Sequence, residues 1–318
     1  MSDSTHGRAL VVGEALVDAV RRPDGSRDVF PGGSPANVAL GLARLGRRVD
    51  LLTWLARDAY GDLVRRHLDA SGVHVLHGDR TPATTPVATA HLDAAGVATY
   101  EFDLEWDLPS SWDEGDDDAL VVHTGSIAAV LTPGGPRVAD LLESRRAVST
   151  ITYDPNLRPA LMGDPADVRP VVERLVRAAD VVKVSDEDLA WLMPGVGPAE
   201  IAETWSRSGP AVVVVTHGGE GAFACTSAGA RLSVPAPRVT VADTVGAGDS
   251  FMGGLIDGLW SVGLLGAEAR PALHDVDSAV VEDVLVRCAR IAALTVSRPG
   301  ADPPSLAELD GTAPGAGA

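Results

Sequence analysis

Lysine and cysteine are scarce in this sequence, and each scarcity excludes a class of site. The chain of 318 residues has a single lysine, Lys183, in the segment DVVKVSDED. No glycine-rich loop precedes it, so the phosphate-binding P-loop G-x-x-x-x-G-K-[ST] is absent. The two cysteines, Cys225 and Cys288, are far apart and have no histidine cluster nearby. This excludes a disulfide framework and a structural zinc site and favours a reducing cytoplasm.

Positive charge and long apolar runs are also lacking. Lys and Arg number 26 against 44 Asp and Glu, which gives a formal net charge of -18. Nucleic-acid backbones are bound by clustered Lys and Arg, so a nucleic-acid partner is excluded. No run approaches the roughly 18 apolar residues of a membrane span, and the first residues lack the apolar region of a signal peptide. We therefore expect a globular cytoplasmic protein without a membrane partner.

Short apolar runs alternate with amphipathic segments along most of the chain. Runs with the length and composition of buried parallel strands lie at 8–13, 49–55, 119–125, 148–156, 180–185 and 211–219. Between them, apolar residues recur every three or four positions in 34–46, 58–72 and 167–179, which predicts helices. The alternation predicts an α/β fold with right-handed crossovers around a mostly parallel sheet.

Two segments depart from this alternation. Residues 84–106 contain two β-rich runs joined at the polar LDAAG, which predicts a β-hairpin in a small separate sheet. Residues 302–318 are rich in Pro, Gly and Ala, which predicts a mobile tail.

The most informative stretch is RVTVADTVGAGDSFMGGLIDGLW at 238–260, where a β-rich run enters a glycine-rich turn that opens into a helical pattern. Glycines at the start of a helix let the amides of Gly246, Ala247 and Gly248 approach a phosphate and stabilise charge on a transferred group. Asp249 follows directly, where a carboxylate can accept a proton from an attacking hydroxyl. An Asp in this pattern also suits a simple helix cap. Dinucleotide binding is disfavoured, because phenylalanine replaces the third glycine of G-x-G-x-x-G.

Two longer segments resemble the signatures of the PfkB, or ribokinase-like, carbohydrate kinases. They are PGGSPANVALGLARLG at 31–46 and DTVGAGDSFMGG at 243–254, in that family's order and spacing. Shorter blocks extend the resemblance over nearly the whole chain: GEALVD at 13–18, ARDAYGD at 56–62, DPNLR at 154–158, KVSDEDL at 183–189 and VVTHGGEGA at 214–222.

The resemblance implies one ribokinase-like kinase domain over residues 1–318, a three-layer α/β/α fold with a central, mostly parallel sheet. It also implies a small β-sheet lid assembled from roughly 11–19, 30–34 and 84–106. Family members often dimerise through this lid, so a homodimer is expected.

The resemblance also assigns roles on the acceptor side of the site. Asp249 matches the catalytic base, and residues 246–248 match the anion hole. The positions that bind sugar hydroxyls are matched by Asp18, Gly33 and Asn37, whose groups suit adjacent hydroxyls. Arg158 is placed to pair with a carboxylate or phosphate of the substrate.

On the donor side, the resemblance implies ATP with Mg²⁺. The nucleotide-binding loop after a strand is matched by Thr216, Gly218 and Gly221. The block KVSDEDL departs from the family's Asn-x-x-Glu with Ser185 and Asp188, and a carboxylate at Asp188 would orient water around Mg²⁺. Asp243 and Thr244 match a region that forms a monovalent-cation site in relatives, which implies K⁺.

The acceptor predicted best is fructose. The blocks GEALVD, DPNLR and KVSDEDL look most like those of fructokinases, and Ser34 replaces a lysine typical of ribokinases. Segment 84–106 has no Lys or Arg, which favours a neutral hexose. 2-Keto-3-deoxygluconate is an alternative acceptor, because Arg158 could pair with its carboxylate. Ribose is a further alternative. A nucleoside is another, because Tyr100, Phe102 and Trp106 could stack on a base, although they could equally fill the core of the lid. A binding regulator without catalysis is the remaining alternative.

Overall fold

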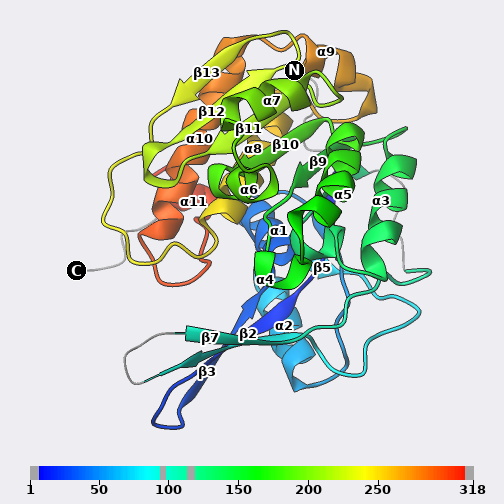
Figure 1. Ribbon diagram of the computed structural model, residues 1–318, viewed down its shortest axis with the longest axis vertical. Helices are drawn as coiled ribbons and strands as arrows, with labels where there is room; N and C mark the ends of the chain where they lie inside the picture. Colours follow the sequence, from blue (N-terminus) through cyan, green and yellow to red (C-terminus); the bar gives the residue numbers. More distant parts are fainter. Residues whose placement is uncertain (1–6, 94–97, 113–118, 312–318) are drawn as a thin grey trace.

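A nine-stranded sheet runs through the middle of the computed structural model, which describes residues 7–93, 98–112 and 119–311 (Figure 1). In spatial order its strands are β13 (Arg231–Val234), β12 (Ala222–Thr226), β11 (Val212–Thr216), β10 (Val181–Ser185), β9 (Thr150–Asp154), β8 (Ala119–Gly125), β1 (Arg8–Val12), β4 (Val49–Leu52) and β5 (Val73–Val75). Neighbours from β11 to β5 are parallel, and β12 and β13 are antiparallel at one edge. The predicted mostly parallel sheet is confirmed.

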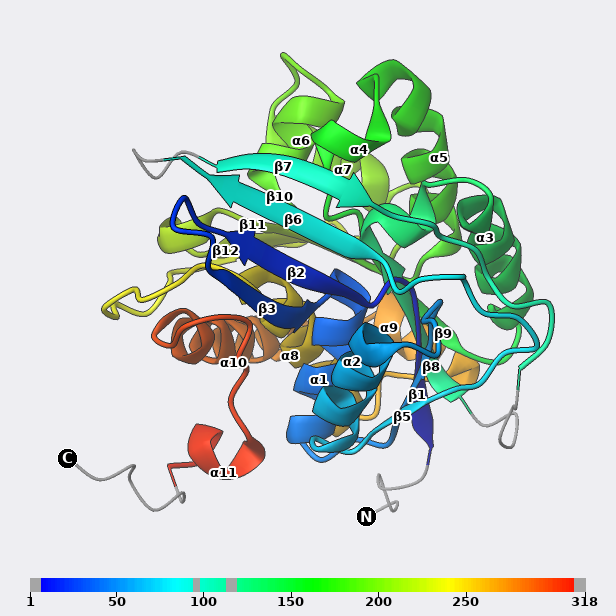
Figure 2. The same cartoon turned by 90° about the horizontal axis from the view of Figure 1, so that it is seen from below.

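Helices cover both faces of this sheet, so the domain has three layers (Figures 1 and 2). One face packs on α1 (Ser34–Arg44), α2 (Ala59–Asp69), α8 (Ala247–Ser261) and α10 (Ser278–Val296). The other packs on α3 (Gly134–Arg145), α5 (Pro165–Ala178), α6 (Asp186–Leu192) and α7 (Pro198–Ser206). Successive strand residues enter opposite cores: Val181 packs with the first set, and Val182 with the second. A strand buried on both faces needs such an unbroken apolar run.

Short helices complete the connections. They are η1 (Ser126–Ala129), α4 (Pro159–Met162), η2 (Gly218–Glu220), η3 (Ala267–Ala269), α9 (Arg270–His274) and α11 (Leu306–Leu309). No helix in the described ranges is long and apolar enough to cross a bilayer.

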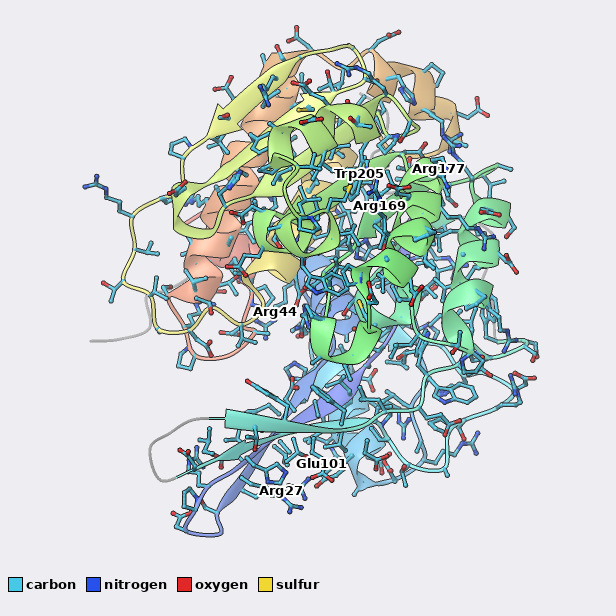
Figure 3. All side chains as sticks on the ribbon, in the orientation of Figure 1. Arg27, Arg44, Glu101, Arg169, Arg177 and Trp205 are labelled. Atoms are coloured by element: carbon cyan, nitrogen blue, oxygen red, sulfur yellow. The ribbon has the colours of Figure 1, made fainter. Side chains whose placement is uncertain are left out.

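A second, four-stranded sheet projects from one end of the domain (Figure 1). Its order is β3 (Arg27–Gly32), β2 (Leu16–Arg21), β6 (Val87–Leu92) and β7 (Ala98–Asp103). The antiparallel pair β6 and β7 is the hairpin expected within 84–106, although residues 94–97 of its connection lie outside the described part. Arg27 of this sheet lies 5.4 Å from the centre of the Tyr60 ring on α2 (Figure 3).

The bounds expected for the first two segments of this sheet need correction. Residues 11 and 12 are fully buried in β1 of the large sheet, because their side chains belong to its two cores. The strand pairing of β2 and β3 continues instead to Arg21 opposite Arg27. Ser34 lies outside the sheet and begins α1.

The predicted mobile tail is wrong for residues 302–311. Ser305 and Glu308 form a capping box at the start of α11, and Leu309 is buried against Leu45 and Ile291. Arg44, labelled in Figure 3, forms an ion pair with Asp302 at 2.5 Å. The Pro-rich composition gave no sign of this short capped helix or of the one apolar side chain that packs on the core. Residues 312–318 lie outside the described part.

Candidate active site

The site lies in a cavity of about 550 Å³ bounded by the smaller sheet, α1, the segments that follow β8 and β9, and the turn before α8. The carboxyl ends of parallel strands are the edge where α/β folds bind their ligands. All eight predicted acceptor-side residues line this cavity: Asp18, Gly33, Asn37, Arg158, Gly246, Ala247, Gly248 and Asp249. Thr244 lines it too.

Asp249 lies in the first turn of α8 and is 6% exposed. Ser34 Oγ donates to its Oδ1 at 2.7 Å, and Asn37 Nδ2 donates to its Oδ2 at 2.8 Å. Asn156 Nδ2 lies 3.1 Å from Oδ1 and 2.6 Å from Ser34 Oγ. Both carboxylate oxygens therefore have donors that fix the orientation of the group on the cavity wall.

These contacts add a role for Asn37, whose predicted contact with a sugar hydroxyl stays a prediction, and they bring Ser34 and Asn156 into the site. Asn37, expected to meet a sugar hydroxyl, donates to the proposed base. The sequence pattern linked Ser34 only to the class of substrate and gave no role to Asn156, which lies in DPNLR two residues after the end of β9. Its φ of 38° is a conformation that Asn adopts more readily than most residues. That asparagine after a strand was the one available signal.

The glycine-rich turn has the backbone that its sequence predicts. Gly246 has φ 75° and precedes the helix, and a Cβ on it would lie 2.7 Å from the Cβ of Ala301. The amide of Ala247 donates to Thr244 O at 3.3 Å, so this amide already has an acceptor within the turn. The first-turn amides of a helix otherwise lack intrahelical partners, which keeps the anion-binding role of 246–248 as a prediction.

Asp18 and Arg158 lie at the cavity with different surroundings. Asp18 Oδ2 lies 2.1 Å from where a Cβ on Gly32 would stand, so glycine there makes room for the carboxylate. Partial burial raises the pKa of Asp18, while the charge of Arg158 lowers it. Arg158 is exposed, and its guanidinium donates to Asn156 Oδ1 at 2.6 Å and to Leu157 O at 3.0 Å. Its pairing with a substrate anion stays a prediction.

Glu14 is a cavity residue that the sequence analysis overlooked. It is 4% exposed, and its Oε2 accepts a hydrogen bond from the amide of Ala128 at 3.2 Å. Burial raises its pKa to about 7, against smaller lowering effects from hydrogen bonds, including that of the Ser126 hydroxyl, and from the charge of Arg158. Ser126 has φ 56°, a conformation that serine rarely adopts. Glu14 therefore links the connection between β1 and β2 to the strained start of η1.

Glu14→Gln is expected to make stability less dependent on pH. Between about pH 4.5 and 7 the folded wild type keeps a proton that the unfolded chain has lost, so its free energy of unfolding falls as pH rises through this window. Glutamine cannot ionise, so the variant is expected to gain on the order of 2–3 kcal/mol over wild type at pH 8, and little at pH 4.5. Urea unfolding at the two pH values measures this. Equal dependence of the unfolding free energy on pH in the two proteins would contradict this prediction. The exposed Glu268→Gln serves as control and is expected to keep the pH dependence of the wild type.

The predicted nucleotide loop lies outside the Asp249 cavity. Thr216 ends β11, and Gly218 and Gly221 have φ of 49° and 112°. A Cβ on Gly218 would meet no atom within 4 Å, whereas one on Gly221 would lie 2.1 Å from Val234 O. Gly221 therefore serves the packing of the turn on β13, and Gly218 faces open space that a ligand can occupy.

The carboxylates expected to act on metals contact the backbone. Asp188 Oδ1 accepts from the amide of Leu157 at 3.0 Å. Asp243 accepts from the amides of Val245 at 3.0 Å and Gly300 at 2.8 Å, and these bonds lower its pKa. The described residues include no group of three or more His, Cys, Asp or Glu side chains arranged for a metal. The predicted roles of Asp188, Asp243 and Thr244 toward cations therefore rest on the resemblance.

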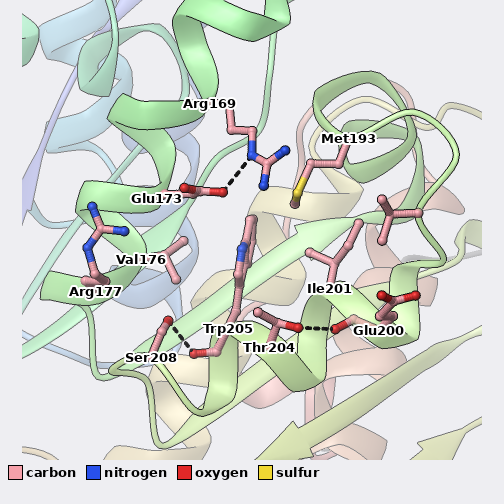
Figure 4. A pocket seen from close by; sticks show the side chains of 11 residues that line it. Arg169, Glu173, Val176, Arg177, Met193, Glu200, Ile201, Thr204, Trp205 and Ser208 are labelled. Carbon is pink, nitrogen blue, oxygen red and sulfur yellow. Dashed lines mark hydrogen bonds and ion pairs between the residues drawn. The ribbon is translucent and has the colours of Figure 1, made fainter.

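Another cavity, of about 330 Å³, lies between α5 and α7 (Figure 4). It contains Trp205 and the ion pair of Arg169 with Glu173, 2.7 Å apart. None of the described residues lining it also lines the Asp249 cavity. It lacks a glycine-rich turn or a buried carboxylate, so the Asp249 cavity is the better candidate for chemistry.

Comparison with known proteins agrees with this geometry. Residues 7–308 match the model of the pfkB family carbohydrate kinases. A fructokinase of Rhizobium leguminosarum bv. trifolii is 36% identical over 263 residues, 79% of each chain. The crystal structure of a Xylella fastidiosa fructokinase with bound ATP superposes with a TM-score of 0.83 at 26% identity, covering 96% of this chain and 97% of that one. A Vibrio cholerae O395 fructokinase double mutant with fructose, ADP and potassium has a TM-score of 0.77 at 26% identity, covering 98% and 99%. Over this extent of sequence and fold, the chain belongs to the pfkB family of carbohydrate kinases.

Proposed function

We propose that this carbohydrate kinase is a fructokinase, which transfers the γ-phosphoryl group of ATP to a hydroxyl of fructose. The observation that carries the proposal is Asp249, a buried carboxylate with both oxygens held by donors, directly after a glycine-rich turn at a helix N-terminus. Asp249 accepts the proton of the attacking hydroxyl, and the amides of 246–248 stabilise negative charge on the transferred group.

Fructose as acceptor is supported by the relatives and by the cavity. The relatives reported above are fructokinases, and one was solved with fructose. The cavity offers hydroxyl-binding groups at Asp18 and Asn37. We further propose that the smaller sheet is a lid that excludes water from the reaction, and that two copies of the chain form a homodimer through it.

ATP, Mg²⁺ and K⁺ complete the proposal. The Xylella relative was solved with ATP and the Vibrio relative with ADP and potassium. Mg²⁺ is supported by the chemistry of ATP-dependent transfer, in which a divalent ion neutralises phosphate charge, and Asp188 is the carboxylate proposed to orient its water. For K⁺ we propose the loop of Asp243 and Thr244. We place the reaction in the cytoplasm, supported by two free, buried cysteines.

A nucleoside acceptor is the second candidate, supported by two aromatic rings in the cavity. Tyr100 and Phe102 both line it, with ring centres 6.1 Å apart and planes 8° from parallel, and Tyr100 is 66% exposed. Such a surface suits a flat base as well as a sugar ring. Trp106, the third aromatic considered, is buried and donates to Ala128 O at 2.9 Å, so it belongs to the core.

Release of ADP with different acceptors tests the assignment. Fructose is expected to give the highest kcat/KM among fructose, ribose, 2-keto-3-deoxygluconate, adenosine and fructose 6-phosphate, with turnover abolished by EDTA and raised when K⁺ replaces Na⁺. A preference for adenosine would favour the second candidate, and a preference for 2-keto-3-deoxygluconate would assign Arg158 to a substrate carboxylate. Binding of ATP without turnover on any acceptor would favour a regulator.

A further inference from the structure

The chain's single lysine lies inside the large sheet, beside the glycine-rich turn. Lys183 is on β10 and is 3% exposed. Its Nζ lies 2.8 Å from Oδ2 of Asp154, the fully buried last residue of β9. The same Nζ donates to Gly248 O at 3.3 Å. The ammonium thus contacts the residue that immediately precedes the proposed base.

A buried ion pair of this kind is unfavourable unless something requires it. Lysine is among the residues least often buried, and desolvation of two charges can exceed their mutual attraction. The sequence uses arginine at all other Lys or Arg positions, so the lysine at this buried position is an exception. Apolar side chains would fill the middle of β10 more favourably, as Val182 and Val184 do on either side. The pair therefore calls for a role other than packing.

The charged and titratable groups around the ammonium come from several elements. Asp154 faces it from β9, and burial raises the pKa of Asp154 while Lys183 lowers it. His123 faces it from β8, and burial together with the Lys183 charge lowers the pKa of His123 to about 3, so the imidazole is neutral. Asp188 of α6 and Asp249 of α8 act on Asp154 through their charges. Lys183 is thus paired with a carboxylate, Asp154, whose charge is also opposed by two further carboxylates.

The geometry directs this cation at the turn. A Cβ on Gly248 would lie 2.9 Å from Nζ, so a side chain there would push the ammonium away. A trans peptide directs its C=O and N–H to opposite sides. With the Gly248 carbonyl held by Lys183, the amide of Asp249 is directed away from the sheet interior. The glycine therefore serves the lysine behind the turn as well as the phosphate expected in front of it.

We propose that Lys183 is a positioning residue for phosphoryl transfer: held by Asp154, its ammonium fixes the Gly248 carbonyl, and with it the Gly248–Asp249 peptide that joins the glycine-rich turn to Asp249. The pair is neutral as a whole, and its positive end faces the helix N-terminus at which the phosphoryl group is transferred. It thereby adds to the field of the helix dipole. The proposal rests on the phosphotransfer function proposed above.

The test uses a double substitution, because Lys183→Met alone leaves Asp154 buried and unpaired, which destabilises the fold by itself. Lys183→Met/Asp154→Asn removes both charges. We expect its melting temperature to recover toward wild type, its kcat to stay about 10- to 100-fold lower, and KM for fructose to change less than threefold. A double variant with wild-type kcat would show that the pair is only structural and would overturn the proposal.

An ion-pair cluster with a buried carboxylate at the start of the same strand supplies the control; Arg146 also lies 3.3 Å from this carboxylate. Asp180 precedes β10, its side chain is 1% exposed, and Arg270 Nε lies 2.7 Å from its Oδ1. Asp180→Asn/Arg270→Met removes one acid and one base at the opposite end of β10 from the turn. Its stability is expected to change, and its kcat to stay within about twofold of wild type. A fall in kcat equal to that of the Lys183 double variant would overturn the proposal.

Nucleotide binding separates failure of this proposal from failure of the proposed function. ADP with aluminium fluoride mimics a phosphoryl group in transfer, and its affinity needs no turnover of any acceptor. We expect the Lys183 double variant to bind this mimic at least 10-fold more weakly than wild type and to bind ADP alone within threefold. Equal affinity of both proteins for the mimic would overturn the role of Lys183, whichever acceptor the wild type uses.

Discussion

Replacing Asp249 by Asn is expected to lower kcat by about 10²–10⁴-fold, the contribution of a general base. Asparagine has nearly the same shape, and its oxygen can still accept from Ser34 and Asn156, whose donors meet Oδ1. Only the contact with Asn37 at the other oxygen is lost. KM for the sugar should therefore change far less than kcat, and steady-state kinetics measures the split.

Asp257 offers a control on the same helix. It is 1% exposed and forms ion pairs with Arg47 and Arg287 at 2.7 and 2.8 Å, outside the cavity. Asp257→Asn is expected to lower the melting temperature and to leave kcat near wild type. If Asp249→Asn retains more than about a tenth of wild-type kcat while Asp257→Asn behaves as expected, Asp249 is a helix-capping residue and the base lies elsewhere.

Gly33→Ala is expected to have the second largest effect, a loss of about 100-fold in kcat/KM with a loss of stability on the order of 1–3 kcal/mol from backbone strain. Gly33 has φ 106°, and a Cβ there would lie 2.5 Å from Glu14 O. Relief requires a shift at the start of α1, which carries Ser34 and Asn37. Because both donate to Asp249, a shift of this helix misplaces the proposed base.

Gly25→Ala separates strain from contact. Gly25 has φ 85° in the connection between β2 and β3, and a Cβ on it would meet no atom within 4 Å. Gly25→Ala should lose stability through the same positive φ as Gly33→Ala, and it should keep the kcat/KM of the wild type. A similar loss of activity in both variants would mean that the approach of Gly33 to the Glu14 carbonyl does not matter for the site.

The sequence predicted what depends on local pattern. Apolar runs such as 211–219 gave β11, since a strand buried on both faces must be apolar throughout, and the glycine-rich turn identified Asp249 because its function requires small residues at adjacent positions. The predicted mobile tail is wrong for residues 302–311, because a composition rich in Pro, Gly and Ala can still contain a capped turn such as the one formed by Ser305 and Glu308.

Contacts between distant segments could not be predicted in this way. Asn156 and Ser34 are 93 and 215 positions away from Asp249 in the sequence. The asparagine after β9 hints at a special position, but no local pattern shows that either side chain meets Asp249. Glu14, between two strands, and Lys183, within one, look like ordinary charged residues in the sequence, and only the folded chain shows them to be buried. Side-chain burial at strand ends depends on which loops close over them, and local periodicity carries no information about that.

The burial of Lys183 also gives the protein a built-in reporter of its own opening. Its side chain is 4% exposed, and the sequence has no other lysine. A reagent that acylates amines will therefore find this ε-amine only when the packing between β10 and the turn before α8 comes apart. Its rate of acylation, followed by mass spectrometry of the peptide that contains Lys183 and not of the N-terminal amine, would measure how often that region opens in the native state. Any ligand that stabilises the turn would slow it.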